Sequence, residues 1–174
     1  MTKRPRAANV QCSTVAASGR QSVRATYPVL FIFDGQCGVC TRFVRILGNV
    51  ESSLRVLHGR DRGSRVRMVP YQKPGVTQST GLSLEECRAS AWAVSFDGER
   101  YRGAEAVNVV ISGAIGTRIP HTLYRLPLIG DLQDLVYGWI AANRRRLPGD
   151  RPYCSQYPSV CQSDQRCVER PTER

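Results

Sequence analysis

One stretch decides the fold, and it reads Val29-Leu-Phe-Ile-Phe-Asp-Gly-Gln-Cys-Gly-Val-Cys-Thr-Arg-Phe-Val-Arg-Ile-Leu47. Its first five residues, Val29–Phe33, are all apolar and include β-branched and aromatic side chains, which predicts a buried strand. Asp34 and Gly35 end this run, and from Thr41 onward the apolar residues recur with the period of an amphipathic helix. The stretch therefore predicts a strand, a tight turn and a helix.

Two cysteines, Cys37 and Cys40, lie at the predicted corner between this strand and this helix, on one face of a first helical turn. The free N–H groups and the positive dipole end of a helix N-terminus stabilise a thiolate, and a second thiol one turn away can attack a mixed disulfide. We therefore interpret Cys37 as the nucleophile and Cys40 as the resolving thiol. Cysteines at this spacing also form half of many zinc sites, so a metal site shared with two C-terminal cysteines is the alternative.

The composition indicates one domain with basic extensions. The chain has 174 residues, and its 25 Lys and Arg against 14 Asp and Glu give a formal charge of +11. A balance this basic favours contact with RNA, an anionic membrane surface or acidic proteins, although a solvated arginine-rich surface explains it equally well. The longest apolar runs have about five residues, too few for a membrane span, so we expect a soluble protein.

Both ends of the chain differ in composition from its middle. Residues 1–27 are rich in Arg, Ser and Ala and contain no acidic residue, which is typical of an organelle transit peptide and equally of a flexible basic docking arm. We therefore expect a mitochondrial or other organellar matrix location, with the cytoplasm as the alternative. The extension 150–174 carries Cys154, Cys161 and Cys167. Because the total of seven cysteines is odd and scattered, we expect no disulfide framework and a reducing compartment.

The segment that follows the first helix is dense in arginine. It contains Arg55, Arg60, Arg62, Arg65 and Arg67, together with two glycines and no apolar period. This pattern predicts an exposed loop. Its guanidinium groups could contact the phosphates of a nucleic acid, or they could simply be solvated.

The remaining periodicity predicts a second strand, a short helix, a hairpin and two further helices. We expect the strands over 66–69, 90–96 and 99–102, and the two long helices over 104–116 and from 131 to 147. Ser83 and Glu86 have the spacing of a capping box, which predicts that the short helix begins there. Cys87, inside that helix, is expected to be a small buried hydrophobe.

The last helix and the segment before it carry two further expectations. The helix has an apolar stripe, with Asp131 as its cap, and we expect Trp139 on this stripe to lie in the core. The segment 120–127 is expected to be irregular, with His121 at its surface. No Gly-rich phosphate loop, catalytic carboxylate pair or Ser/His/Asp order occurs, so the sequence predicts no cofactor and no metal.

The order of these elements is thioredoxin-like, and the sequence resembles the DCC family of thiol-disulfide oxidoreductases. The resemblance lies in Phe33-Asp-Gly-x-Cys-x-x-Cys40, in Tyr101-Arg-Gly-Ala-Glu-Ala106, in the terminal helix from Leu135 to Arg144, and in the Cys154 that follows. It spans roughly 28–157 and implies an α/β, thioredoxin-like domain at 28–149. That domain would have a central mixed sheet of about four strands flanked by helices, plus an extra C-terminal helix.

The resemblance also implies a chemistry. It makes Cys37 and Cys40 a dithiol-disulfide exchange pair acting on a thiol or disulfide substrate, with Asp34 beside them. A carboxylate there could relay the proton released as the thiolate forms, although Asp-Gly also favours a turn for its own sake.

Two departures support a different reading of the same domain. Where thioredoxins that act on proteins place a cis proline, this chain has Ser90 or Ala91, which argues against protein-disulfide reduction. The basic arms lie outside the part that resembles the family. The alternative function is therefore a non-catalytic structural or assembly subunit of an organellar ribonucleoprotein, such as a mitochondrial ribosome, with RNA or acidic proteins as partners.

Overall fold

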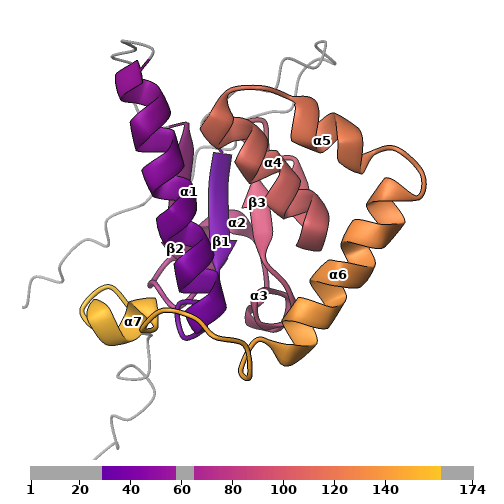
Figure 1. Cartoon of the computed structure of the whole chain (residues 1–174). Coiled ribbons are helices and arrows are strands. Elements are labelled where there is room, and N and C mark those ends of the chain that lie inside the picture. The colour runs from indigo at the N-terminus through magenta and orange to yellow at the C-terminus, as the bar shows by residue number, and fades with distance from the viewer. Residues whose placement is uncertain (1–28, 58–64, 162–174) are drawn as a thin grey trace, which may run out of the picture.

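The computed structural model describes residues 29–57 and 65–161, and Figure 1 shows how their helices and strands are arranged. The elements follow in the order β1 (Val29–Phe33), α1 (Gly38–Leu57), β2 (Val66–Pro70), α2 (Val76–Thr80), α3 (Leu84–Ala89), β3 (Trp92–Val94), β4 (Arg100–Arg102), α4 (Gly103–Ile115), α5 (Ile119–Tyr124), α6 (Ile129–Asn143) and α7 (Tyr153–Gln156). The predicted arm at 1–27, the middle of the basic loop, and residues 162–174 of the predicted C-terminal extension 150–174 lie outside the described residues.

The four strands form one mixed sheet in the order β2-β1-β3-β4. β1 pairs in parallel with β2, from Val29 opposite Val66 to Phe33 opposite Pro70. β3 runs antiparallel to both β1 and β4. The predicted mixed sheet of a thioredoxin-like fold is therefore confirmed, with the apolar run of β1 at its centre.

The side chains of β1 alternate between two hydrophobic clusters, as the pleat of a strand requires. Phe31 and Phe33 pack with α1 and α4 on one face, together with Leu47 and Val110. Ile32 points to the other face, where it packs with residues of α2, α3 and the loop between them. Because both faces are covered, the strand has the continuous apolar sequence of a fully buried strand.

Most of the predicted helices and strands are present, but several begin or end at other residues than predicted. Ser83 accepts the backbone N–H of Glu86 and the Glu86 carboxylate accepts the N–H of Ser83, so the capping box is confirmed. Hydrogen bonds to this carboxylate hold the pKa of Glu86 below its usual value. Cys87 is buried as expected. The third and fourth strands are shorter than predicted, because the hairpin turn begins at Ser95 rather than at Asp97.

The expectation that 120–127 is irregular is wrong, because α5 occupies most of it. Pro120 lies in the first turn of this helix, where a missing N–H removes no helical hydrogen bond. His121 is not an isolated surface residue either. Its Nε2 lies 3.1 Å from the Glu105 carboxylate, and its ring contacts the edge of Tyr101.

The last helix is rotated relative to the prediction. α6 begins at Ile129, so Asp131 lies inside the first turn instead of capping it. Trp139 is not in the core, since it is 58% exposed. Two polar contacts set the rotation: Gln133 accepts a hydrogen bond from Asn108, and the Tyr137 hydroxyl accepts the backbone N–H of Ala91. Gln133 and Tyr137 therefore line a cavity against the sheet together with Val136 and Ile140 of the predicted stripe. Leu135 and Trp139 of that stripe are exposed instead.

Candidate active site

The Cys37–Cys40 pair occupies the corner that the sequence predicted. Cys37 directly precedes α1 and Cys40 lies in its first turn, and the two form a disulfide with a Cα–Cα distance of 5.2 Å. The backbone N–H of Cys40 points at the Cys37 sulfur, 3.2 Å away. The Cys37 side chain thus caps α1, and the same N–H is available to a thiolate when the disulfide opens.

The chain that follows α6 runs beneath this corner (Figure 1). The N–H of Asp150 donates to the Gly38 carbonyl at 3.0 Å, and the N–H of Cys154 donates to the Gly35 carbonyl at 2.9 Å. Gly149 lies so close to the Gly38 backbone that there is no room for a Cβ on it. This segment, residues 149–154, thus packs on the backbone on either side of Cys37, which is only 6% exposed.

Cys40 is the more accessible cysteine of the pair. It is partly exposed and borders two cavities. The smaller, about 60 Å³, also has Asp34 and Arg144 in its wall, and the larger, about 440 Å³, is almost wholly apolar. This exposure runs opposite to the predicted division of roles, because Cys37 is buried and Cys40 is partly exposed.

Asp34 is held in place by three groups. Its Oδ1 accepts the Gln72 side-chain amide at 2.8 Å and the backbone N–H of Gln36 at 3.0 Å. Its Oδ2 lies 3.7 Å from the Arg144 guanidinium, which also donates to the Arg88 carbonyl. Asp34 therefore shapes the turn, as Asp-Gly predicts, and its carboxylate also lines the cavity beside Cys40.

Sequence reasoning missed two residues of this site. Gln72 gave no signal, because it reaches Asp34 from the loop after β2. Arg144 is the last residue of the terminal-helix pattern, Leu135 to Arg144, on which the family resemblance partly rests. That pattern was the available signal.

The position where thioredoxins place a cis proline is filled differently here. The N–H of Ala91 donates to the Tyr137 hydroxyl at 2.9 Å, and the Ser90 hydroxyl lies 3.2 Å from the same oxygen. A residue of α6 therefore occupies the backbone donor that faces the cysteine corner.

The C-terminal cysteines correct one expectation. Cys154 and Cys161 form a second disulfide, with a Cα–Cα distance of 5.4 Å, although no disulfide framework was expected. The spacing of these cysteines in the sequence did not predict their pairing, because the turns after α7 bring the two residues together. Cys87 is the free cysteine of the described chain, and burial raises the pKa of its thiol. Cys167 lies outside the described residues.

The comparison with known families agrees with this geometry. Residues 31–150 match the DCC1-like thiol-disulfide oxidoreductases. The chain belongs to this family. No curated protein matches the chain, and no solved structure does. The family match runs from within β1 to Asp150, so the cysteine corner, Asp34 and Arg144 are all part of the DCC1-like region.

Two further features were considered from the sequence, a metal site and a membrane-spanning helix. Within 29–57 and 65–161, no three His, Cys, Asp or Glu side chains are grouped so that they could hold a metal ion. No helix in these ranges has the length and apolar character needed to cross a membrane.

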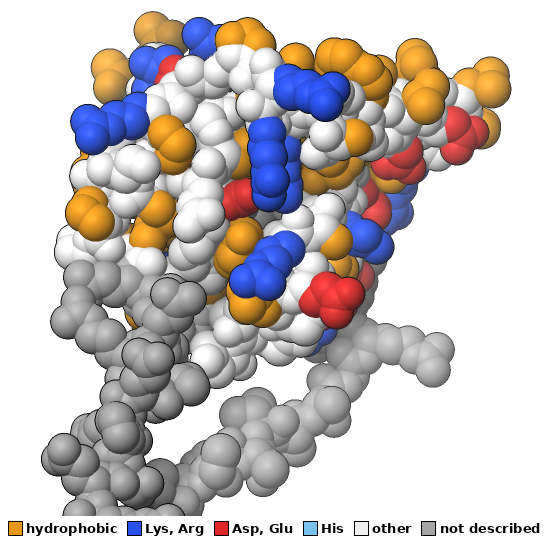
Figure 2. All heavy atoms as spheres, turned by 90° about the horizontal axis from the view of Figure 1, so that it is seen from below, with side chains coloured by type: hydrophobic (Ala, Val, Ile, Leu, Met, Phe, Trp, Pro, Cys, Tyr) orange, Lys and Arg blue, Asp and Glu red, His pale blue; other side chains and the backbone are white. Residues whose placement is uncertain are grey.

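The predicted basic loop is only partly described. Arg60 and Arg62 lie outside the described residues, whereas Arg55 and Arg67 are exposed. The backbone N–H of Arg65 donates to the Glu51 carboxylate at 2.6 Å. On the face seen in Figure 2, Lys and Arg side chains are spread among uncharged and apolar ones and do not gather into one block.

Proposed function

We propose that this chain is a thiol-disulfide oxidoreductase that exchanges a disulfide between its Cys37–Cys40 pair and a thiol substrate. The observation that carries the proposal is the disulfide at the start of α1 with Cys40 open to two cavities. Membership in the DCC1-like family supports the same chemistry. The substrate is a small thiol or disulfide, since the Ala91 backbone donor is already taken by Tyr137.

The exposure of the two sulfurs supports an order of steps. A substrate thiolate attacks the Cys40 sulfur, the Cys37–Cys40 bond breaks, and Cys37 leaves as a thiolate that accepts the Cys40 N–H. A second substrate thiol then attacks the substrate sulfur of the mixed disulfide, and Cys40 leaves. Two electrons and two protons pass from the substrate to the pair. In the reverse direction Cys40 attacks a substrate disulfide and Cys37 resolves the intermediate.

Asp34 is proposed to handle the proton. Its carboxylate shares the small cavity with Cys40, so it can accept the proton of an incoming thiol and return it to a departing thiolate. Arg144 and Gln72 position this carboxylate from two other elements.

The test is a redox titration of the full chain against dithiothreitol, followed by alkylation and peptide mass spectrometry. We expect a reversible two-electron transition of Cys37 and Cys40. Burial and the neighbouring Glu86 carboxylate raise the pKa of Cys87, so it should alkylate slowly and serve as an internal reference. Turnover of a dithiol substrate that survives in Cys37→Ser or Cys40→Ser would overturn the proposal.

The two single variants also test the order of steps. In the reduced state, Cys40 of the Cys37→Ser protein should be alkylated faster than Cys37 of the Cys40→Ser protein, because Cys37 is buried and Cys40 is partly exposed. Faster labelling of Cys37 would restore the roles predicted from the sequence.

The ribonucleoprotein role and the mitochondrial location stay predictions of the sequence. They depend on the arms and on the middle of the basic loop. Of the predicted loop arginines that the structure describes, the backbone N–H of Arg65 is bound by Glu51, and Arg55 and Arg67 are exposed. We therefore propose the oxidoreductase function alone.

A further inference from the structure

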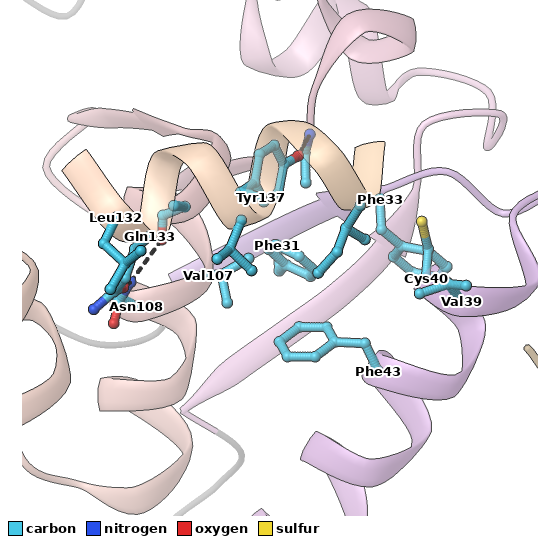
Figure 3. A pocket seen from close by; sticks show the side chains of 14 residues that line it. Phe31, Phe33, Val39, Cys40, Phe43, Val107, Asn108, Leu132, Gln133 and Tyr137 are labelled. Carbon is cyan, nitrogen blue, oxygen red and sulfur yellow. Dashed lines mark hydrogen bonds between the residues drawn. The ribbon is translucent and has the colours of Figure 1, made fainter. Parts of the chain in front are cut away.

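The larger cavity beside Cys40 is an apolar chamber between the sheet and the last long helix. Its volume is about 440 Å³, within the usual range of about 300–1,000 Å³ for pockets that hold small ligands. Figure 3 shows Phe31 and Phe33 along its inner side, with Cys40 and Val39 at one end and Asn108, Gln133 and Leu132 at the other.

The chamber exists because polar contacts hold α6 at a distance from the sheet. Asn108 on α4 donates to Gln133 at one end, and the Tyr137 hydroxyl is bound by the backbone of Ala91. Between these two contacts, Val136 of α6 and the phenylalanine side chains of β1 line the same cavity. The result is a space whose walls are apolar and whose position is fixed by hydrogen bonds.

The walls determine which ligand can enter. The Asn108 amide is bonded to the Ala104 carbonyl and to Gln133, and the Tyr137 hydroxyl to Ala91 and Ser90. A peptide would bring one N–H and one C=O per residue into this space, and burying such groups without partners is unfavourable. A charged thiol such as a small acidic peptide is disfavoured for the same reason. An aliphatic or aryl group meets no such penalty.

We propose that this chamber binds the apolar group of the substrate, which is a small-molecule thiol or disulfide whose sulfur is carried on an aliphatic or aryl chain. This inference rests on the proposed function, because Cys40 supplies the reacting sulfur at the end of the chamber. The chain of the ligand lies along Phe31 and Phe33, and its sulfur meets the Cys40 sulfur.

The test uses methyl, butyl and octyl 2-pyridyl disulfides with the reduced, full-length Cys37→Ser protein. The Cys40 thiolate attacks the alkyl-bearing sulfur, the S–S bond breaks, and 2-thiopyridone leaves with the electron pair and absorbs light. Peptide mass spectrometry assigns the product to Cys40. Each buried methylene should raise the rate at low probe concentration about threefold to fourfold, until the chamber is full. The other cysteines of the same sample report the effect of chain length outside the chamber.

Two neighbouring positions on α6 give a matched pair of variants. Val136 lines the chamber, whereas Leu135 does not and is 71% exposed. Val136→Trp fills the space and should abolish the dependence on chain length, and Leu135→Trp should keep it. Leu132→Trp, at the far end of the chamber, is a second filling variant if Val136→Trp does not fold.

The outcomes separate this inference from the function on which it rests. Equal rates for the three probes at a reactive Cys40 would overturn the inference and leave the oxidoreductase function standing. A Cys40 that reacts with no probe would overturn the function. The chamber is then tested without thiol chemistry, since 1-octanol should raise the unfolding temperature of the wild type and of Leu135→Trp. An equal rise in Val136→Trp would show that octanol does not bind in the chamber.

Discussion

Asp34 combines two roles that a single isosteric substitution can separate. Asp34→Asn keeps the oxygen that accepts the Gln72 amide and the Gln36 N–H, so the turn should persist. It removes the group that takes a proton beside Cys40. We expect exchange with dithiothreitol at pH 7 to fall about a hundredfold, in the range of lost acid–base catalysis.

The pH profile distinguishes proton transfer from positioning. If Asp34 moves a proton, the difference in exchange rate between the wild type and Asp34→Asn should shrink as the pH rises, because the substrate then arrives already as a thiolate. A ratio of wild-type to Asp34→Asn exchange rates that is constant from pH 6 to 9 would assign Asp34 a structural role. Asp97→Asn, at an exposed carboxylate of the β3–β4 turn, is the matched control and should leave the rate unchanged.

At the scale of single residues, chain adjacency determined what the sequence could predict. Cys37, Cys40 and Asp34 lie within one short loop, so a strand followed by a helix brings them together without long-range information. Gln72 and Arg144 reach the same loop from the end of β2 and the end of α6. Their contacts with Asp34 depend on how those elements pack, and the local sequence around Asp34 does not predict them.

Among the elements, the segment 149–154 makes the closest backbone contact with the cysteine corner. A Cβ on Gly149 would collide with the Gly38 backbone, which cannot rotate away as a side chain can. Gly149→Ala should therefore lower the free energy of unfolding by roughly 1–3 kcal/mol, as overpacking does elsewhere. It should also speed alkylation of reduced Cys37 by displacing the segment that packs on the backbone on either side of it.

Gly138→Ala is the matched control for this prediction. Gly138 lies inside α6 with open space where its Cβ would be, so alanine should raise the free energy of unfolding by about 0.5–1 kcal/mol. Urea unfolding of the two variants and the wild type measures both effects. Equal stabilities for the two variants would mean that residues 149–154 do not press on Gly38.

The elements also show where periodicity is a reliable guide. The capping box at Ser83 and the core helix α4 were predicted because their signals are local or face a complete core. The rotation of α6 was not, because Leu135 and Trp139 of its predicted stripe are exposed while Gln133 and Tyr137 line the cavity against the sheet. Hydrogen bonds from Asn108 and Ala91 decided the rotation instead, and they join residues far apart in the chain.

For the whole molecule, the chamber implies that α6 is less firmly held than the rest of the fold. The core of the domain lies between β1, α1 and α4, whereas α6 packs mainly on α4 and α5 and leaves most of its apolar side chains exposed. Local openings that release α6 should therefore cost less free energy than global unfolding.

Tyr137→Phe tests this hierarchy, because it removes the acceptor of the Ala91 N–H at the boundary between α6 and the sheet. Leaving a buried donor without a partner costs about 1–3 kcal/mol. Amide hydrogen exchange in α6 should accelerate about tenfold or more, while β1 and α4 keep their protection. Tyr157→Phe is the control and should change neither, because Tyr157 directly follows α7, which Figure 1 shows on the opposite side of the domain from α6. Exchange that rises equally in β1, α4 and α6 would mean that α6 unfolds only with the whole domain.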